Sequence, residues 1–212
     1  MSSKKNLLSA LVVLGILTSN ALLFTPAASA DSSTYIVNVN TDESDANIGD
    51  GFCDAGEGAC TLRAAIEEAN SNVDADTIEF NIPGGGVQTI SPSSQLPTVT
   101  NPLTINGYSQ PGSAVNTADS PLPMNSVITI QLKNTNNLDI FGLKTESSDV
   151  TIRGLAIDDF TDAIWIDGLD QNKQNISISG NYLGTDTTGL VAPTLQEVIG
   201  VKMINGCSNV TV

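Results

Sequence analysis

The most informative gap in this 212-residue sequence is histidine, which does not occur at all. Without it, neither a Ser-His-Asp arrangement nor a histidine-ligated metal site can form within the chain. Basic residues are also scarce, because eight lysines and arginines stand against 23 aspartates and glutamates. This acid excess argues against binding to nucleic acid phosphates. Aromatic residues make up 4% of the chain, which is little for a groove that binds glycans by stacking.

A short basic segment and an apolar run predict a secretory signal peptide over residues 1–30. Lys4 and Lys5 precede the apolar run from Leu7 to Phe24, and small residues lead up to Ala30. A membrane anchor is the alternative, but the run is near the lower length limit for spanning and polar residues interrupt it. Cleavage after Ala30 leaves six basic and 23 acidic residues, a net charge of −17. We therefore expect an acidic exported chain without a membrane span after cleavage.

Three cysteines remain in the exported chain, where an oxidising compartment favours pairing. Cys53 and Cys60 enclose a short loop with two glycines, so they are the expected disulfide. Cys207 is left over and is expected to be a buried or turn residue rather than a reactive thiol.

One convincing helix follows this loop. Thr61 can cap it, Asn70 can end it, and one apolar stripe runs along it at helical spacing, formed by Leu62, Ala65, Ile66 and Ala69. With a first strand at Tyr35–Val39, this helix forms an expected N-terminal cap module over residues 31–76. Its predicted role is to seal the open end of a stack of strands.

The loop at residues 41–54 is rich in carboxylates, and such oxygen ligands can hold Ca²⁺. The candidate ligands are Asp42, Asp45, Asp50 and Asp54. The spacing does not match an EF-hand, and acidic turn residues are commonly only solvated. Calcium is therefore one of two interpretations of this loop.

After the helix, short strands of alternating apolar and polar residues recur over residues 77–212. Treating six residues as equivalent gives spacings of 25, 25, 22, 26 and 34: Phe80, Ile105, Ile130, Ile152, Ile178 and Val212. Most of these spacings fit one coil of a solenoid. A second strand series alternates with the first, at Leu138–Phe141, Ala163–Asp167 and Gly200–Asn205.

We therefore predict an all-β fold, a right-handed parallel β-helix with a short N-terminal capping helix. An antiparallel sandwich or jelly roll is the competing fold, but it need not repeat one local signature. The wide last spacing is explained by a loop inserted at residues 185–194. Because Val210–Val212 ends within a strand, we expect either a fragment truncated at this end or pairing with another chain.

The segment Cys60-Thr-Leu-Arg-Ala-Ala-Ile66 resembles the exported bacterial proteins named for a Cys-Ser-Leu-Arg-Glu-Ala motif. The acidic Gly-Asp-Gly segment before it and Asp76–Phe80 after it are similar to the same module, and residues 150–212 resemble the β-helix repeats of pectin-lyase-like proteins. Two positions depart from the motif, because Thr61 replaces its serine and Ala64 replaces its glutamate. The resemblance implies an exported β-helix with a surface-associated role, but no single chemistry.

Candidate catalytic carboxylates cluster at Asp158, Asp159 and Asp162, where an acid and a base could act on a glycosidic bond. The structural alternative is an ordinary polar turn. Arg153, beside Gly154, is the only candidate for the base of a lyase. Trp165 alternates out of phase with the two isoleucines beside it and is expected to face solvent, and Tyr182 is the other aromatic candidate for sugar contact.

The sequence favours a secreted or cell-surface structural and interaction module without catalytic activity. Its expected partners are cell-surface glycans or other extracellular proteins. One alternative is a polysaccharide lyase or glycoside hydrolase that acts on acidic glycans. The other is a calcium-stabilised adhesin-like module.

Overall fold

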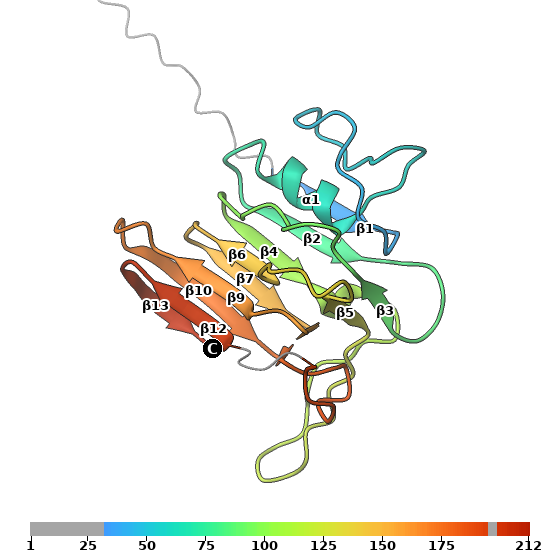
Figure 1. Cartoon of the computed structure of the whole chain (residues 1–212), viewed down its shortest axis with the longest axis vertical. Helices are drawn as coiled ribbons and strands as arrows, with labels where there is room; N and C mark the ends of the chain where they lie inside the picture. The colour runs from blue at the N-terminus through green and yellow to red at the C-terminus, as the bar shows by residue number, and fades with distance from the viewer. Residues whose placement is uncertain (1–31, 195–198) are drawn as a thin grey trace, which may run out of the picture.

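The computed structural model describes residues 32–194 and 199–212, so the expected signal peptide lies outside the described residues. The described strands all belong to three parallel sheets, here called sheets A, B and C (Figure 1). Sheet A has the order β1 (Thr34–Val37), β2 (Asp76–Phe80), β4 (Leu103–Asn106), β7 (Val150–Arg153), β10 (Lys173–Ser179) and β13 (Cys207–Thr211). Sheet B has the order β11 (Tyr182–Leu183), β8 (Leu155–Asp158), β5 (Ile130–Lys133) and β3 (Gln88–Ile90). Sheet C has the order β12 (Ile199–Ile204), β9 (Asp162–Asp167) and β6 (Leu143–Thr145).

The chain passes through the three sheets in a repeating order. From β7 in sheet A it enters β8 in sheet B and β9 in sheet C, and it then returns to sheet A as β10, paired with β7. The next pass, from β10 to β13, repeats this order. All pairs of these strands are parallel, which rules out the antiparallel sandwich that we considered from the sequence.

The register of sheet A stacks isoleucine on isoleucine inside the molecule. Ile78, Ile105, Ile152 and Ile178 are successive partners, each at most 2% exposed. Burial of each such side chain contributes about 1.5–3 kcal/mol to folding. Two of the six residues expected to be equivalent were wrong, and a third, Val212, follows the end of β13 and is 69% exposed. Phe80 pairs with Val37, so Ile78 takes its place, and Ile130 belongs to sheet B.

The expected second strand series is correct in part. β9 and β12 lie in sheet C, but the strand expected at 138–141 is absent among the described residues, and β6 at Leu143–Thr145 takes its place. Sheet B was missed, so each full pass has three strands rather than two. The insertion expected at residues 185–194 is confirmed as a loop between β11 and β12.

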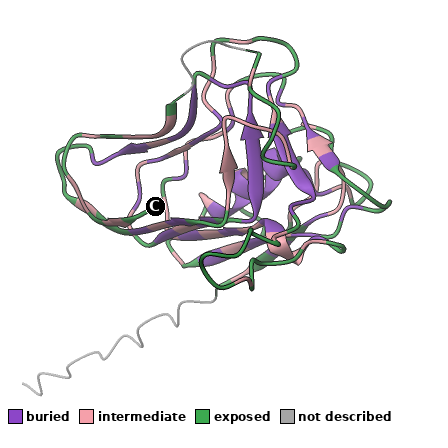
Figure 2. Ribbon diagram, turned by 90° about the horizontal axis from the view of Figure 1, so that it is seen from below, coloured by how far each residue is buried: buried purple, intermediate pink, exposed green. Residues whose placement is uncertain are grey.

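The helix α1 (Leu62–Ala69) packs against β1 and β2 at the first end of sheet A (Figure 1). Thr61 is its N-cap, because the Thr61 Oγ1 accepts a hydrogen bond from the Ala64 N–H. Seven of its eight residues are buried, including Arg63 and Glu68, which the apolar stripe had placed on other faces. In Figure 2 the buried ribbon gathers at this end, while strands near the C-terminus carry more exposed residues. Among residues 32–194 and 199–212, no helix is long and apolar enough to cross a membrane.

Candidate functional site

The three candidate aspartates lie at the bend between β8 and β9. Asp158 ends β8, Asp162 begins β9, and Asp159 adopts a left-handed backbone conformation with φ of 62° between them. The buried Phe160 anchors the bend from inside. All three carboxylates are almost fully buried, at 2–3% exposure. The sequence therefore located the cluster, but not its burial.

A lysine that the sequence did not single out holds two of these carboxylates. Lys133 ends β5 and is the register partner of Asp158 on β8. Its Nζ lies 2.5 Å from the Asp158 Oδ2 and 2.9 Å from the Asp159 Oδ2. Burial disfavours the ammonium of Lys133, but the two carboxylates outweigh it and raise the pKa of Lys133 above its ordinary value.

The inserted loop contacts one of these carboxylates, that of Asp159. Thr194 donates hydrogen bonds from its N–H and its Oγ1 to the Asp159 Oδ1, at 2.5 and 2.7 Å. Burial alone would raise the pKa of Asp159, yet the hydrogen bonds from Lys133 and Thr194 lower it below its ordinary value. A carboxyl group with a lowered pKa is a poor general acid near neutral pH.

Asp162 belongs to a second group, which surrounds Trp165 on sheet C. The Asp162 Oδ2 lies 3.3 Å from the Nζ of Lys202 on β12. Lys202 and Lys144 are the register partners of Trp165 on the two neighbouring strands, and their Nζ atoms lie 4.2 and 5.1 Å from the Trp165 ring centroid. Phe141 meets the same ring edge-on. Trp165 therefore points away from the buried isoleucines as expected, but two cations and a ring already contact it.

Arg153 and Tyr182 lie apart from this bend. Arg153 ends β7 in sheet A and is exposed, and its Nε donates to the Asn106 Oδ1. The structure does not pair it with the carboxylates in the way a lyase would need. The Tyr182 hydroxyl lies 3.0 Å from the Ser126 Oγ, and Tyr182 lines a cavity of about 430 Å³ with Met124 and Leu190.

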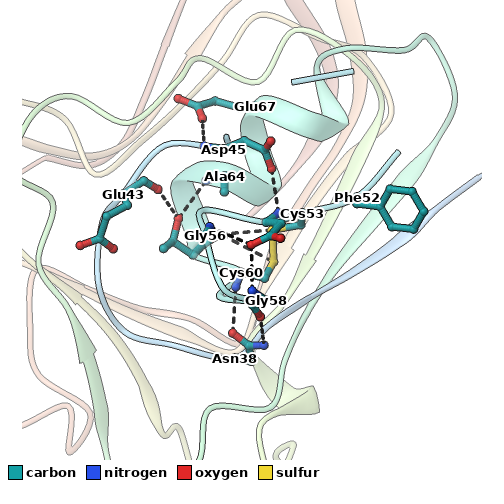
Figure 3. The surroundings of a disulfide bond; sticks show 12 residues. Asn38, Glu43, Asp45, Phe52, Cys53, Gly56, Gly58, Cys60, Ala64 and Glu67 are labelled. Carbon is teal, nitrogen blue, oxygen red and sulfur yellow. Dashed lines mark hydrogen bonds between the residues drawn. A yellow bond between two sulfur atoms is a disulfide. The ribbon is translucent and has the colours of Figure 1, made fainter. Parts of the chain in front are cut away.

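The four candidate calcium ligands have other partners, which for three of them lie within the N-terminal loop, part of which Figure 3 shows. The Asp45 carboxylate accepts from the Asn47 and Asp54 N–H groups. The Asp54 Oδ1 accepts from the N–H groups of Gly56 and Gly58.

The remaining two candidates are held separately. The Asp50 Oδ1 accepts from the Phe52 N–H, and Asp42 pairs with Arg63 at 2.9 Å. Within the described part of the chain, no three acidic or cysteine side chains group as metal ligands would. Calcium binding stays a prediction.

Arg63 and Glu68, both on α1, hold the loops around the helix. The Arg63 guanidinium donates to the Asp42 carboxylate and to the backbone carbonyls of Ser94 and Gln95. The Glu68 carboxylate is fully buried and accepts from the backbone N–H groups of Gly49 and Gly51, at 2.6 and 2.5 Å. Sequence reasoning missed both roles. The signal that could have revealed them is a pair of charged residues beside the apolar stripe of α1, close in sequence to a glycine-rich loop.

The expected disulfide between Cys53 and Cys60 is present (Figure 3). Cys207 is free and partly buried. Replacing Cys53 and Cys60 together with serine should lower the free energy of unfolding by about 2.5 kcal/mol, because the bond restricts the unfolded chain. Urea unfolding of the protein measures this loss. Cys207→Ser is the control and should change stability much less; an equal loss in that variant would contradict the assignment.

Comparison of the sequence with models of known protein families and with curated proteins gives no match. The resemblance to exported proteins with the Cys-Ser-Leu-Arg-Glu-Ala motif therefore rests on the residues themselves.

Proposed function

We propose that this chain is an exported right-handed parallel β-helix that acts as a structural and interaction module at the cell surface or outside the cell, without catalytic activity of its own. The observation that carries this proposal is the burial of the candidate carboxylates. Asp158, Asp159 and Asp162 are at most 3% exposed, and each contacts a lysine. A polymeric substrate needs open access to its acid and base, and this bend offers none.

The repeating passage through three parallel sheets supports the β-helix. Connections between parallel strands of one sheet are right-handed in nearly all proteins, which favours a right-handed coil. The packing of α1 on β1 and β2 supports its role as an N-terminal cap, because a helix there covers apolar residues of the first strands. The disulfide near α1 supports export, since such bonds persist in oxidising compartments.

Two long loops beside sheet B supply the interaction surface in this proposal. The segment between β4 and β5 exposes Leu122 and Met124, at 65% and 67%, and the segment between β11 and β12 exposes Leu190 at 87%. Tyr182 lines the cavity between these loops. Exposed apolar side chains next to a tyrosine fit a glycan or an extracellular protein as partner.

A glycan turnover assay tests the absence of catalysis. The exported protein is incubated with pectic and other acidic glycans, and unsaturated products and new reducing ends are measured. We expect no turnover above that of a heat-denatured sample. Reproducible turnover that Asp159→Asn abolishes and Arg153→Ala preserves would assign a hydrolase to the bend and reject the proposal, and turnover that needs Arg153 would reject it in favour of a lyase.

A further inference from the structure

The contact between Lys133, Asp158 and Asp159 has the composition of an amide-forming site. We propose that the Lys133 Nζ and the Asp158 carboxyl carbon join in an intramolecular isopeptide bond, with Asp159 as the catalytic residue that transfers the protons. The bond would cross-link β5 to β8, which lie side by side in sheet B. It would be a covalent modification of the folded protein and does not depend on the interaction role proposed above.

Proximity is the first argument. Lys133 and Asp158 are direct register partners on parallel strands, so the backbone holds both side chains together. The nucleophilic nitrogen lies 2.5 Å from the Asp158 Oδ2, already in contact with the group that it would attack. Holding two reacting groups in this way supplies much of the barrier reduction in intramolecular reactions.

The buried charge of Asp158 is the second argument. Its side chain is 2% exposed, while Lys133, which pairs with it, approaches from the more open side at 30%. The Asp158 Oδ1 is buried and has no hydrogen-bond partner among the described residues. A buried charge with an unpartnered oxygen is costly, and conversion of the pair to a neutral amide removes both charges.

Asp159 is placed to transfer the protons. Its Oδ2 lies 2.9 Å from the Lys133 Nζ, while Thr194 holds its Oδ1. Asp159 accepts a proton from the ammonium and passes it to the Asp158 carboxylate, and the neutral amine then attacks the carbonyl carbon of the neutral Asp158 carboxyl group. A second proton from the nitrogen follows the same route. One C–N bond forms, one C–O bond breaks, and one water leaves, so no oxidant or further reactant is needed.

The starting ion pair sets the slow step of this reaction. The two carboxylates stabilise the ammonium form of Lys133 more than burial disfavours it, so the pKa of Lys133 lies above its ordinary value. The amine that attacks is therefore formed only by proton transfer within the contact. A bond made this way is expected in the folded chain and not in the unfolded chain, where Lys133 is apart from the two aspartates.

Mass spectrometry of the exported full chain tests the cross-link. After reduction of the disulfide, the intact mass should lie about 18 Da, one water, below that expected from the observed N-terminus. Trypsin should then fail to cut after Lys133 and should yield one linked species that joins residues 64–144 to residues 154–173. A folded chain with the full expected mass and free cleavage after Lys133 would overturn the proposal.

Four variants locate the reaction. Lys133→Arg and Asp159→Asn should restore the full mass, and Asp158→Asn should lose about 17 Da instead, because ammonia then leaves. Lys202→Arg is the matched control, because it alters the neighbouring ion pair with Asp162 and should keep the water loss. Loss of water that maps to Asp50-Gly51 or Asp167-Gly168, where aspartate can cyclise, would also reject the cross-link.

Discussion

Replacing Arg63 with alanine should lower the free energy of unfolding by about 3–5 kcal/mol, the largest effect that we expect from a single substitution. The Arg63 and Asp42 side chains are each 9% exposed, so removal of the guanidinium leaves a buried carboxylate without its cation. The carbonyls of Ser94 and Gln95 lose their donors in the same step. Urea unfolding followed by circular dichroism measures the change.

A matched control separates this effect from the general loss of an arginine. Arg153→Ala removes an exposed guanidinium that donates to Asn106, and we expect a change of about 0.5 kcal/mol or less. Arg63→Lys should recover only part of the loss, because one ammonium cannot reproduce the planar fork that reaches Asp42 and two carbonyls. Equal losses for Arg63→Ala and Arg153→Ala would contradict the anchoring role of Arg63.

Replacing Glu68 with glutamine should lower the free energy of unfolding by about 2–3 kcal/mol, since charged hydrogen bonds to two backbone N–H groups are weakened in a buried place. The substitution keeps the shape of the side chain but turns one acceptor into a donor that faces Gly49 or Gly51. Hydrogen exchange of the two glycine N–H groups should also become faster. Urea unfolding measures the first change, and exchange followed by NMR measures the second.

Glu67 is the control for this prediction because it is the next residue on the same helix. It accepts a single hydrogen bond, from the Asp45 N–H, and is only partly buried. Glu67→Gln should therefore cost about 1 kcal/mol or less. If the Glu67 variant were as unstable as the Glu68 variant, the loss of stability would come from the changed charge of the helix and not from the hydrogen bonds to Gly49 and Gly51.

The strands of sheet A could be predicted because their outer face is partly exposed, so apolar and polar residues alternate. Register could not be predicted, since a period of two residues fixes only the face of a side chain. Phe80 and Ile78 lie on the same face of β2, so the alternation alone could not choose between them as the member of the isoleucine stack. Only the register, in which Phe80 pairs with Val37, makes the choice. Sheet B was missed because β8 is buried on both faces and β3 and β11 have three and two residues.

The candidate site shows the same limit. The aspartates of the bend are close in sequence, so their cluster was visible. Lys133 lies 25 residues before Asp158, and only the length of one pass through the sheets brings the two together. Arg63 and Glu68 were expected outside the apolar stripe, and they lie there, but loops cover them. Charge in a sequence does not tell whether another segment folds over it.

Three left-handed residues occupy one corner of successive passes, just before or within the strands of sheet A. They are Asp149, Asn175 and Asn209, with φ between 50° and 60°. The Asn175 side-chain amide donates to the Asp149 Oδ1, and the Asn209 side-chain amide donates to the Asn175 Oδ1. The chain uses 26 residues for the first interval and 34 for the second, which contains the inserted loop. Hydrogen bonds between side chains at one corner thus align neighbouring passes whether the interval has 26 or 34 residues. Segments can therefore be inserted at the other corners without shifting the stacked isoleucines of sheet A.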